Sequence, residues 1–361
     1  MIDDLRQAAL QGSASAPFLI SYLQLCQASY ADPADIPGLM SRVQPLGQGS
    51  WSCGWGPAVD EDDANLAYVA VYTDAPTGLP VVAAVVIRGT DVDIGDTWGI
   101  VKQAFEDLYV PWQSRLPWMI GGNVRVADGT LDALDTIAGL TFNGTPLTDY
   151  LTGYLADPAN RNPLLAVTGH SLGGCLTTVV APWLSTILAA AQLTTPIVPV
   201  TFAAPSAGNA AFSAYFAETF GYGVRAYNSL DIVPMAWAGL DGIPTAYDGC
   251  PIAAPDAVRL GVDMFKAAMD ATGAAYAQPA TNQMPLGGSC QPTRKPDDWY
   301  EEALLQHATA TYMTLLGGTT LFDETGRAAP TAAAALARRS RARYRRADTL
   351  QRPHLARSLM R

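Results

Sequence analysis

The chain has 361 residues, of which 49% are hydrophobic and 15% charged, so it is long enough to bury one large core. The formal net charge of −11 is unevenly distributed, because residues 327–361 hold ten arginines and a single acid. The residues before this stretch hold 12 basic and 32 acidic side chains. An acidic body of this kind repels nucleic acid, which excludes nucleic-acid binding as the function of residues 1–326.

The N-terminal segment lacks the features of a secretory signal. Its first ten residues, MIDDLRQAAL, carry two acids where such a signal has positive charge. The apolar run that follows, APFLISYLQL, is short and has no basic region before it. We therefore expect no cleavable signal, and hence a cytoplasmic protein or one exported by another route.

From residue 79 onwards, apolar runs of strand length alternate with helical patterns. Strands are predicted at 79–87, 164–169, 196–205 and 223–228. Helices are predicted at 131–140, 175–191 and 209–220, the last with Asn209 as N-cap. This alternation predicts an α/β fold with a mainly parallel sheet flanked by helices, and chemistry beyond the carboxyl ends of the strands.

The most apolar long segment is CLTTVVAPWLSTILAAAQL, residues 175–193. Four hydroxyl side chains and Pro182 interrupt it, so we expect a buried helix and no transmembrane segment. Cys175, at its start, is expected to be a buried thiol.

The residues Gly169-His170-Ser171-Leu172-Gly173 fit the pattern G-x-S-x-G between the second predicted strand and its helix. A serine on a sharp strand-to-helix turn needs small neighbours, because strand and helix approach closely there. The turn raises the hydroxyl above the sheet, near a helix N-terminus. This context predicts a nucleophile at Ser171, and a structural glycine turn is the alternative.

A serine hydroxyl is a weak nucleophile at neutral pH and needs a base, which in turn needs an orienting acid. Three histidines are available as the base. His170 adjoins the serine and is expected to point elsewhere, and His354 lies in the arginine-rich tail. The predicted base is therefore His307.

The orienting acid is expected at a strand end between the nucleophile and the base. Asp231 directly follows the strand at 223–228 and is the predicted acid. Its rivals, Asp241 and Asp248, lie in a glycine-rich loop. The order Ser171, Asp231, His307 is that of the α/β-hydrolases.

Negative charge that develops on an attacked carbonyl must meet fixed N–H donors. The backbone N–H of Leu172, directly after the nucleophile, is the first predicted donor. The second is the N–H of Thr90 in VVIRGTD, where Gly89 allows the backbone to approach closely. A simple strand-ending turn is the alternative interpretation of this stretch.

Five motifs follow one another between residue 81 and about residue 315: VVIRGTD, VTGHSLGGCL, VTFAAPSAGN, YNSLDIVPM and LLQHATATY. In this order they resemble the class 3 lipases, the fungal-lipase-like family of α/β-hydrolases. The resemblance implies triad roles for Ser171, Asp231 and His307, and an oxyanion hole formed by Thr90 and Leu172.

The resemblance further implies a serine hydrolase that cleaves carboxylic esters of lipids, above all a triacylglycerol lipase, without metal or organic cofactor. A phospholipase A1 or general carboxylesterase is the enzymatic alternative, and a silent fold that binds lipid or a protein is the other. Two departures from the family bear on substrate preference. Ser206 stands where members often have arginine, and Val126-Ala127-Asp128-Gly129 stands in place of a histidine-glycine pair.

In this family the segment after the oxyanion strand is a lid, which here corresponds to residues 91–122. Its apolar candidates for covering substrate are Trp98, Val101, Phe105, Leu108 and Trp112. The last four follow helical spacing, which fits either an amphipathic lid that opens transiently at a lipid surface or an ordinary core helix. The DVDIGD stretch lacks the glutamate that a calcium loop needs at its twelfth position, so no calcium is expected there.

The interval between the predicted acid and base is long, and we place a loop-rich insertion at 237–296. Cys250 and Cys290 flank a loop-rich region within it and are one candidate disulfide pair. Cys26 and Cys53 are another, because five cysteines define no single framework. The cysteine and histidine spacing suits no metal site, and none is predicted.

The arginine-rich tail at 327–361 has two interpretations. It could form a basic helix that touches anionic phospholipid, or a flexible, solvated extension. We favour the extension, since charge-rich segments of this kind bury too little apolar surface to fold alone.

Overall fold

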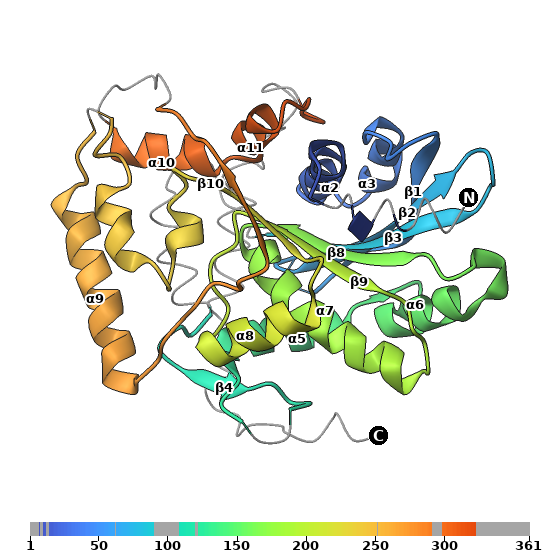
Figure 1. Ribbon diagram of the computed structural model, residues 1–361, viewed down its shortest axis with the longest axis horizontal. Coiled ribbons are helices and arrows are strands. Elements are labelled where there is room, and N and C mark those ends of the chain that lie inside the picture. Colours follow the sequence, from blue (N-terminus) through green and yellow to red (C-terminus); the bar gives the residue numbers. More distant parts are fainter. Residues whose placement is uncertain are drawn as a thin grey trace.

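The computed structural model describes residues 7, 10–11, 14–61, 63–89, 108–119, 122–250, 252–290 and 298–322. A central sheet lies between two layers of helices, and a further group of helices stands at one end of the sheet (Figure 1). The predicted α/β class with a mainly parallel sheet is confirmed.

The central sheet has seven strands in the order β1-β2-β3-β8-β9-β10-β11. The pairs β1–β2 and β2–β3 are antiparallel, and the strands from β3 to β11 run parallel to one another. Their bounds are Gly49–Val59 (β1), Leu66–Asp74 (β2), Pro80–Ile87 (β3), Leu164–His170 (β8), Ile197–Phe202 (β9), Val224–Asn228 (β10) and Asn282–Leu286 (β11). Two small antiparallel pairs lie outside it: β4 (Gln113–Arg115) with β5 (Arg125–Ala127), and β6 (Thr141–Phe142) with β7 (Thr145–Pro146).

The four predicted strands correspond to β3, β8, β9 and β10. Every residue of β3 and β8 is buried, which is why these strands are continuous apolar runs in the sequence. The sequence prediction lacks β1, β2 and β11. Strand β11 forms a polar edge with one buried residue, Leu286, so it has no apolar run by which to recognise it.

The helices pack in two layers with separate apolar cores. One core joins the sheet to α5–α9 and α10, and the other joins its opposite face to α2, α3 and α11 (Figure 1). The bounds are Ala16–Ala28 (α2), Ile36–Leu39 (α3), Asp128–Gly139 (α5), Leu147–Ala156 (α6), Leu172–Ala190 (α7), Ala210–Thr219 (α8), Asp256–Thr272 (α9), Trp299–His307 (α10) and Thr309–Leu315 (α11). The predicted N-cap of α8 is confirmed, since the Asn209 side chain accepts from the Phe212 N–H at 2.9 Å.

Helix α7 is the apolar segment considered above as a membrane span. Of the helices in the described ranges, it alone has the length and composition to cross a bilayer, and 72% of its most apolar window is buried inside the molecule. Cys175 is fully buried within it, and that burial raises the pKa of its thiol to about 12. A thiol with such a pKa is protonated and inert at neutral pH.

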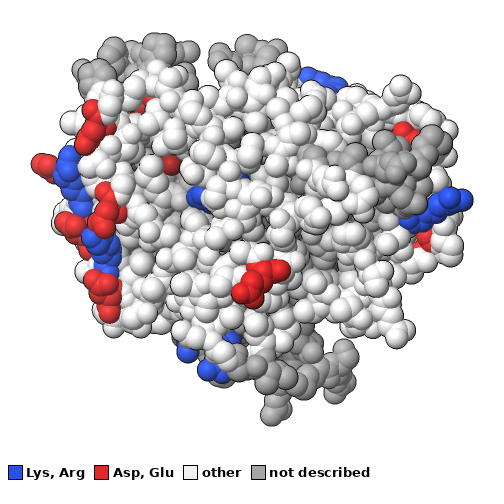
Figure 2. All heavy atoms as spheres, in the orientation of Figure 1, with Lys and Arg blue, Asp and Glu red and all other residues white. Residues whose placement is uncertain are grey.

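The segment at 237–296, which we predicted to be a loop-rich insertion, is more regular than expected, because it contains the 17-residue helix α9 and the strand β11. Helix α9 turns Val258, Val262, Phe265 and Met269 toward the core, a helical apolar spacing. A disulfide joins Cys250 to Cys290 across this segment, whereas Cys26 and Cys53 are free. The charged residues of α9 form most of the charge visible at the left edge of Figure 2.

Candidate active site

Ser171 lies on the turn between β8 and α7 with φ 60° and ψ −127°. A residue with a side chain rarely adopts this conformation, which costs about 1–3 kcal/mol. A Cβ on Gly169 would stand 2.2 Å from the Gly173 carbonyl oxygen, and a Cβ on Gly173 would stand 2.3 Å from that of Ile87. The two glycines of the pattern are therefore required by the close approach of strand and helix, as the sequence predicts.

The turn after β3 lies directly against this serine. A Cβ on Gly89 would stand 2.5 Å from the His170 carbonyl oxygen and 3.2 Å from the Ser171 Cβ. The next residue, Thr90, lies outside the described residues, so its predicted oxyanion role stays a prediction. Leu172 is the first residue of α7, where backbone N–H groups have no partner within the helix.

Ser171, His307 and Asp231 form one hydrogen-bonded chain. The Ser171 Oγ lies 2.9 Å from the His307 Nε2, and the His307 Nδ1 lies 2.8 Å from the Asp231 Oδ2. The three residues come from the ends of β8, α10 and β10, and are 4%, 6% and 1% exposed. The structure thus brings all three predicted residues together in the geometry of a serine nucleophile with its base and orienting acid.

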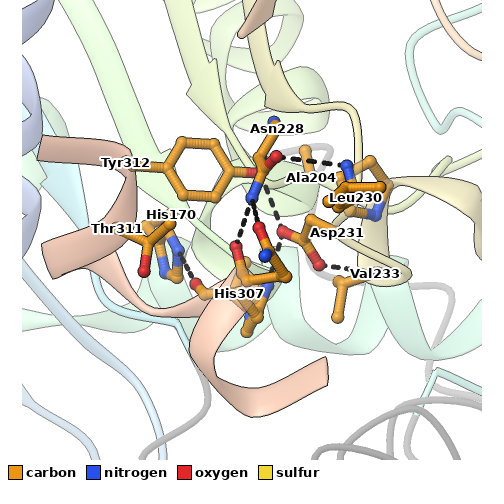
Figure 3. A network of polar contacts seen from close by, with 12 residues as sticks. His170, Ala204, Asn228, Leu230, Asp231, Val233, His307, Thr311 and Tyr312 are labelled. Carbon is orange, nitrogen blue, oxygen red and sulfur yellow. Dashed lines mark hydrogen bonds and ion pairs between the residues drawn. The ribbon is translucent and has the colours of Figure 1, made fainter. Parts of the chain in front are cut away.

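Asp231 has two further partners, which Figure 3 shows around its carboxylate. The Tyr312 hydroxyl donates to its Oδ2 at 2.7 Å, and the Val233 N–H donates to its Oδ1 at 2.9 Å. Burial raises the pKa of Tyr312 well above its ordinary value, so this hydroxyl stays protonated and can donate at neutral pH. Sequence reasoning missed Tyr312, although a buried carboxylate is expected to need more than one donor.

Comparison with known proteins bears on the family that the chain resembles. Residues 84–239 match the family model of Lipase (class 3). The predicted resemblance to class 3 lipases is thereby confirmed. No curated protein sequence matches the chain.

Solved structures that are similar to this chain include lipases. The crystal structure of M37 lipase superposes with a TM-score of 0.69 at 24% identity, over 84% of this chain and 91% of that one. A lipase from Rhizopus microsporus var. chinensis gives a TM-score of 0.44 at 20% identity, over 60% of this chain and 67% of that one. A triacylglycerol lipase from Penicillium expansum gives 0.41 at 18%, over 63% and 74%. The first of these likenesses supports the α/β-hydrolase fold.

The rival acids, Asp241 and Asp248, lie at the surface, outside the hydrogen-bonded chain at Ser171. The Asp241 side chain is 84% exposed and pairs with Lys266 on α9. Asp248 is likewise exposed. His170 does point away from the Ser171 hydroxyl, toward the His307 backbone, and His354 lies outside the described residues. Of the candidate acids and bases that the structure describes, only Asp231 and His307 belong to the hydrogen-bonded chain that begins at Ser171.

Ser206 occupies the position at which class 3 lipases often have arginine, and it serves the loop that carries the acid. Its hydroxyl donates to the Ala236 carbonyl at 3.1 Å and accepts from the Ala238 N–H at 3.2 Å. Its own N–H also donates to the Ala236 carbonyl. The hydrogen bonds of the buried Ser206 thus connect the segment after Asp231 to the loop after β9.

The structure describes only two of the predicted lid residues, Leu108 and Trp112. Trp98, Val101 and Phe105 lie outside the described residues, so a lid at 91–122 stays a prediction. The helical spacing predicted for Leu108 and Trp112 is wrong: residues 108–111 form a turn in which Tyr109 has φ 46°. This turn separates the two side chains, since Leu108 is buried in the core and Trp112 is 55% exposed.

In the part of the chain that the structure describes, no group of three or more His, Cys, Asp and Glu side chains is placed to hold a metal ion.

Proposed function

We propose that the protein hydrolyses carboxylic esters of lipids, with triacylglycerols as its substrates, through an acyl-enzyme formed on Ser171. The observation that carries this proposal is the buried hydrogen-bonded chain from Ser171 through His307 to Asp231. The class 3 lipase match over residues 84–239 supports lipid esters as the substrate class.

In the proposed reaction, the Ser171 Oγ attacks the ester carbonyl while the His307 Nε2 takes the hydroxyl proton. The resulting imidazolium then gives this proton to the leaving alcohol. Asp231 holds the imidazole through Nδ1 and stabilises its cation, an arrangement that leaves Nε2 free to accept from serine. Water, activated by the same imidazole, releases the fatty acid and restores the serine.

The tetrahedral intermediates carry a negative oxygen, which we assign to the backbone N–H groups of Leu172 and Thr90. Support for Leu172 comes from its place as the first residue of α7, where the helix dipole also favours negative charge. Gly89 brings the turn before Thr90 against the serine. The proposed cycle requires no metal ion and no organic cofactor.

Covalent labelling tests the nucleophile. A fluorescent alkyl phosphonate should modify the protein once, and peptide mass spectrometry should place the adduct on Ser171. Ser171→Ala should abolish labelling and lower ester hydrolysis by about 10⁴-fold or more, with an unchanged circular dichroism spectrum. Hydrolysis by this variant at the wild-type rate would refute the assignment.

A substrate series tests the lipid part of the proposal. Rates on p-nitrophenyl esters from acetate to palmitate, on emulsified triolein and on phosphatidylcholine should favour long acyl chains and the triacylglycerol. A preference for acetate would indicate a general carboxylesterase, and release of fatty acid from phosphatidylcholine alone would indicate a phospholipase.

A further inference from the structure

Helix α10 ends at His307, so the backbone that carries the base is a helix C-terminus. The last four carbonyl groups of a helix have no partner within it and must be paired elsewhere when they are buried. Here the Ala308 N–H donates to the carbonyls of Leu304 and Leu305 at 3.1 and 3.3 Å. The remaining two carbonyls, of Gln306 and His307, receive side-chain donors.

These two donors come from the strand ends that carry the other triad members. The Asn228 Nδ2, at the end of β10, donates to the Gln306 carbonyl at 2.9 Å. The His170 Nε2, at the end of β8, donates to the His307 carbonyl at 3.0 Å. Figure 3 shows the contact between His170 and His307, with Asn228 near Asp231. The strand that presents the nucleophile therefore also holds the base, through the residue before the serine.

The hydrogen-bond partners of His170 fix its tautomer. A carbonyl oxygen only accepts, so the Nε2 must carry hydrogen, and in the neutral imidazole the Nδ1 is then an acceptor. The Tyr30 hydroxyl lies 3.1 Å from this Nδ1 and is placed to donate to it. His170 itself is 4% exposed, and its ring centroid lies 4.8 Å from that of His307.

We propose that His170, oriented by Tyr30, is a positioning residue for the catalytic base; this inference rests on the proposed function. His170 does not touch the reacting atoms. It fixes the carbonyl of the residue whose imidazole must lie within reach of both the serine hydroxyl and Asp231.

Loss of this donor has a kinetic consequence distinct from loss of stability. Without His170, the His307 carbonyl would be buried and unpaired, which is destabilising. The C-terminal end of α10 can reorient so that this carbonyl meets solvent or another donor. Such a reorientation lengthens the 2.9 Å separation between the His307 Nε2 and the Ser171 Oγ. We therefore expect kcat to fall and KM to stay constant, because the contact matters in the transition state.

Four variants test the proposal. His170→Phe removes the donor with little change of volume, and His170→Gln restores an amide donor near the place of Nε2. Tyr30→Phe removes only the hydroxyl that fixes the tautomer. Tyr22→Phe is the matched control, since this tyrosine lies buried on α2, the helix that leads to the half-buried Tyr30. The readout is kcat per phosphonate-titrated site on one p-nitrophenyl ester, with KM and the melting temperature.

The expected result is a fall of about 10- to 100-fold in kcat per site for His170→Phe at constant KM, and a smaller fall of about 3- to 10-fold for Tyr30→Phe. His170→Gln should recover most of the loss, and Tyr22→Phe should match the wild type. Unchanged kcat per site in both Tyr30→Phe and His170→Phe, with only a lower melting temperature, would overturn the proposal. If His170→Phe does not fold, Tyr30→Phe decides. A wild-type protein that neither hydrolyses the ester nor takes up phosphonate would instead refute the proposed function.

Discussion

The polar side chains around Ser171 are buried and hydrogen-bonded to one another. Helix α9, by contrast, exposes charged residues and two apolar side chains, Leu260 and Met264, to solvent. The first region is made of strand ends and a helix end that meet through hydrogen bonds. The second is held by one apolar face of a helix and by the Cys250–Cys290 disulfide.

The difference predicts which property of the protein, its reaction rate or its stability, a mutation in each region should change. A hydrogen-bonded cluster positions atoms to within tenths of an ångström, so damage to it should appear mainly in the rate. An apolar helix face and a covalent link fix a segment without aiming any single group, so damage there should appear mainly in stability. Four changes test this division, from the largest expected loss of rate to the smallest.

Asp231→Asn should cause the largest loss, because it removes the charge that orients the imidazole and stabilises its cation. We expect kcat/KM on a p-nitrophenyl ester to fall by about 1000-fold or more with little change in KM. Asp241→Asn is the control, since this exposed carboxylate pairs only with Lys266 at the surface. Equal activity of the two variants would remove Asp231 from the site.

Gly89→Ala should come next. The added Cβ would meet the Tyr30 hydroxyl at 2.3 Å and the His170 carbonyl at 2.5 Å, so the turn before Thr90 must move. Displacement of one oxyanion donor costs about 100-fold in kcat. Gly153→Ala on α6 has open space around its Cβ and should retain wild-type kcat. Equal kcat values for Gly89→Ala and Gly153→Ala would show that the turn after β3 supplies no hydrogen-bond donor to the oxyanion.

Tyr312→Phe should lower kcat by about 10-fold at acidic pH and less at alkaline pH. The lost hydroxyl donates to the Asp231 oxygen that also faces His307, so its removal leaves the carboxylate charge less compensated. A less compensated anion holds the proton on the imidazole more strongly, and the acid limb of the pH–rate profile should move to higher pH. The raised pKa of Tyr312 means that the wild-type hydroxyl adds no ionisation of its own to this profile. A shift of the acid limb to lower pH would contradict the assigned donor direction.

The double change Cys250→Ser with Cys290→Ser should alter kcat at 25 °C by less than about threefold. Opening a link between residues 40 apart in sequence should lower the free energy of unfolding by about 3 kcal/mol. Chemical denaturation against Cys53→Ser, which changes a free cysteine, measures this loss. A large fall in kcat without loss of stability would show that the segment closed by this disulfide contributes to catalysis. The proposed difference between this segment and the hydrogen-bonded residues around Ser171 would then be wrong.

The sequence predicts the parallel centre of the fold and the three residues of the serine chain, because both leave local patterns. Strands buried on two faces are unbroken apolar runs, and Ser171 must have glycine on either side of its turn. Strand β11 lacks such a signal because it is polar, whereas helix α9 has a helical apolar spacing that the prediction of a loop-rich insertion overlooked.

The supporting contacts could not be predicted for a different reason. Tyr30, Asn228 and Tyr312 reach the site across sequence separations of 140, 78 and 81 residues, and no local pattern encodes those distances. His170 stands beside the serine, yet its role depends on where α10 ends in space. The helical spacing of Leu108 and Trp112 fails because Tyr109 adopts a left-handed φ that periodicity cannot reveal.

The two outermost strands of the central sheet bear on how the protein behaves at high concentration. An open edge can recruit a strand from another molecule and start aggregation. Strand β11 has only five residues and includes Pro285, which cannot donate a ladder hydrogen bond, and β1 has register shifts at Cys53 and Trp55 that interrupt its regular spacing. Neither edge offers a long unbroken ladder to a strand of another molecule, so we expect the protein to stay monodisperse at high concentration.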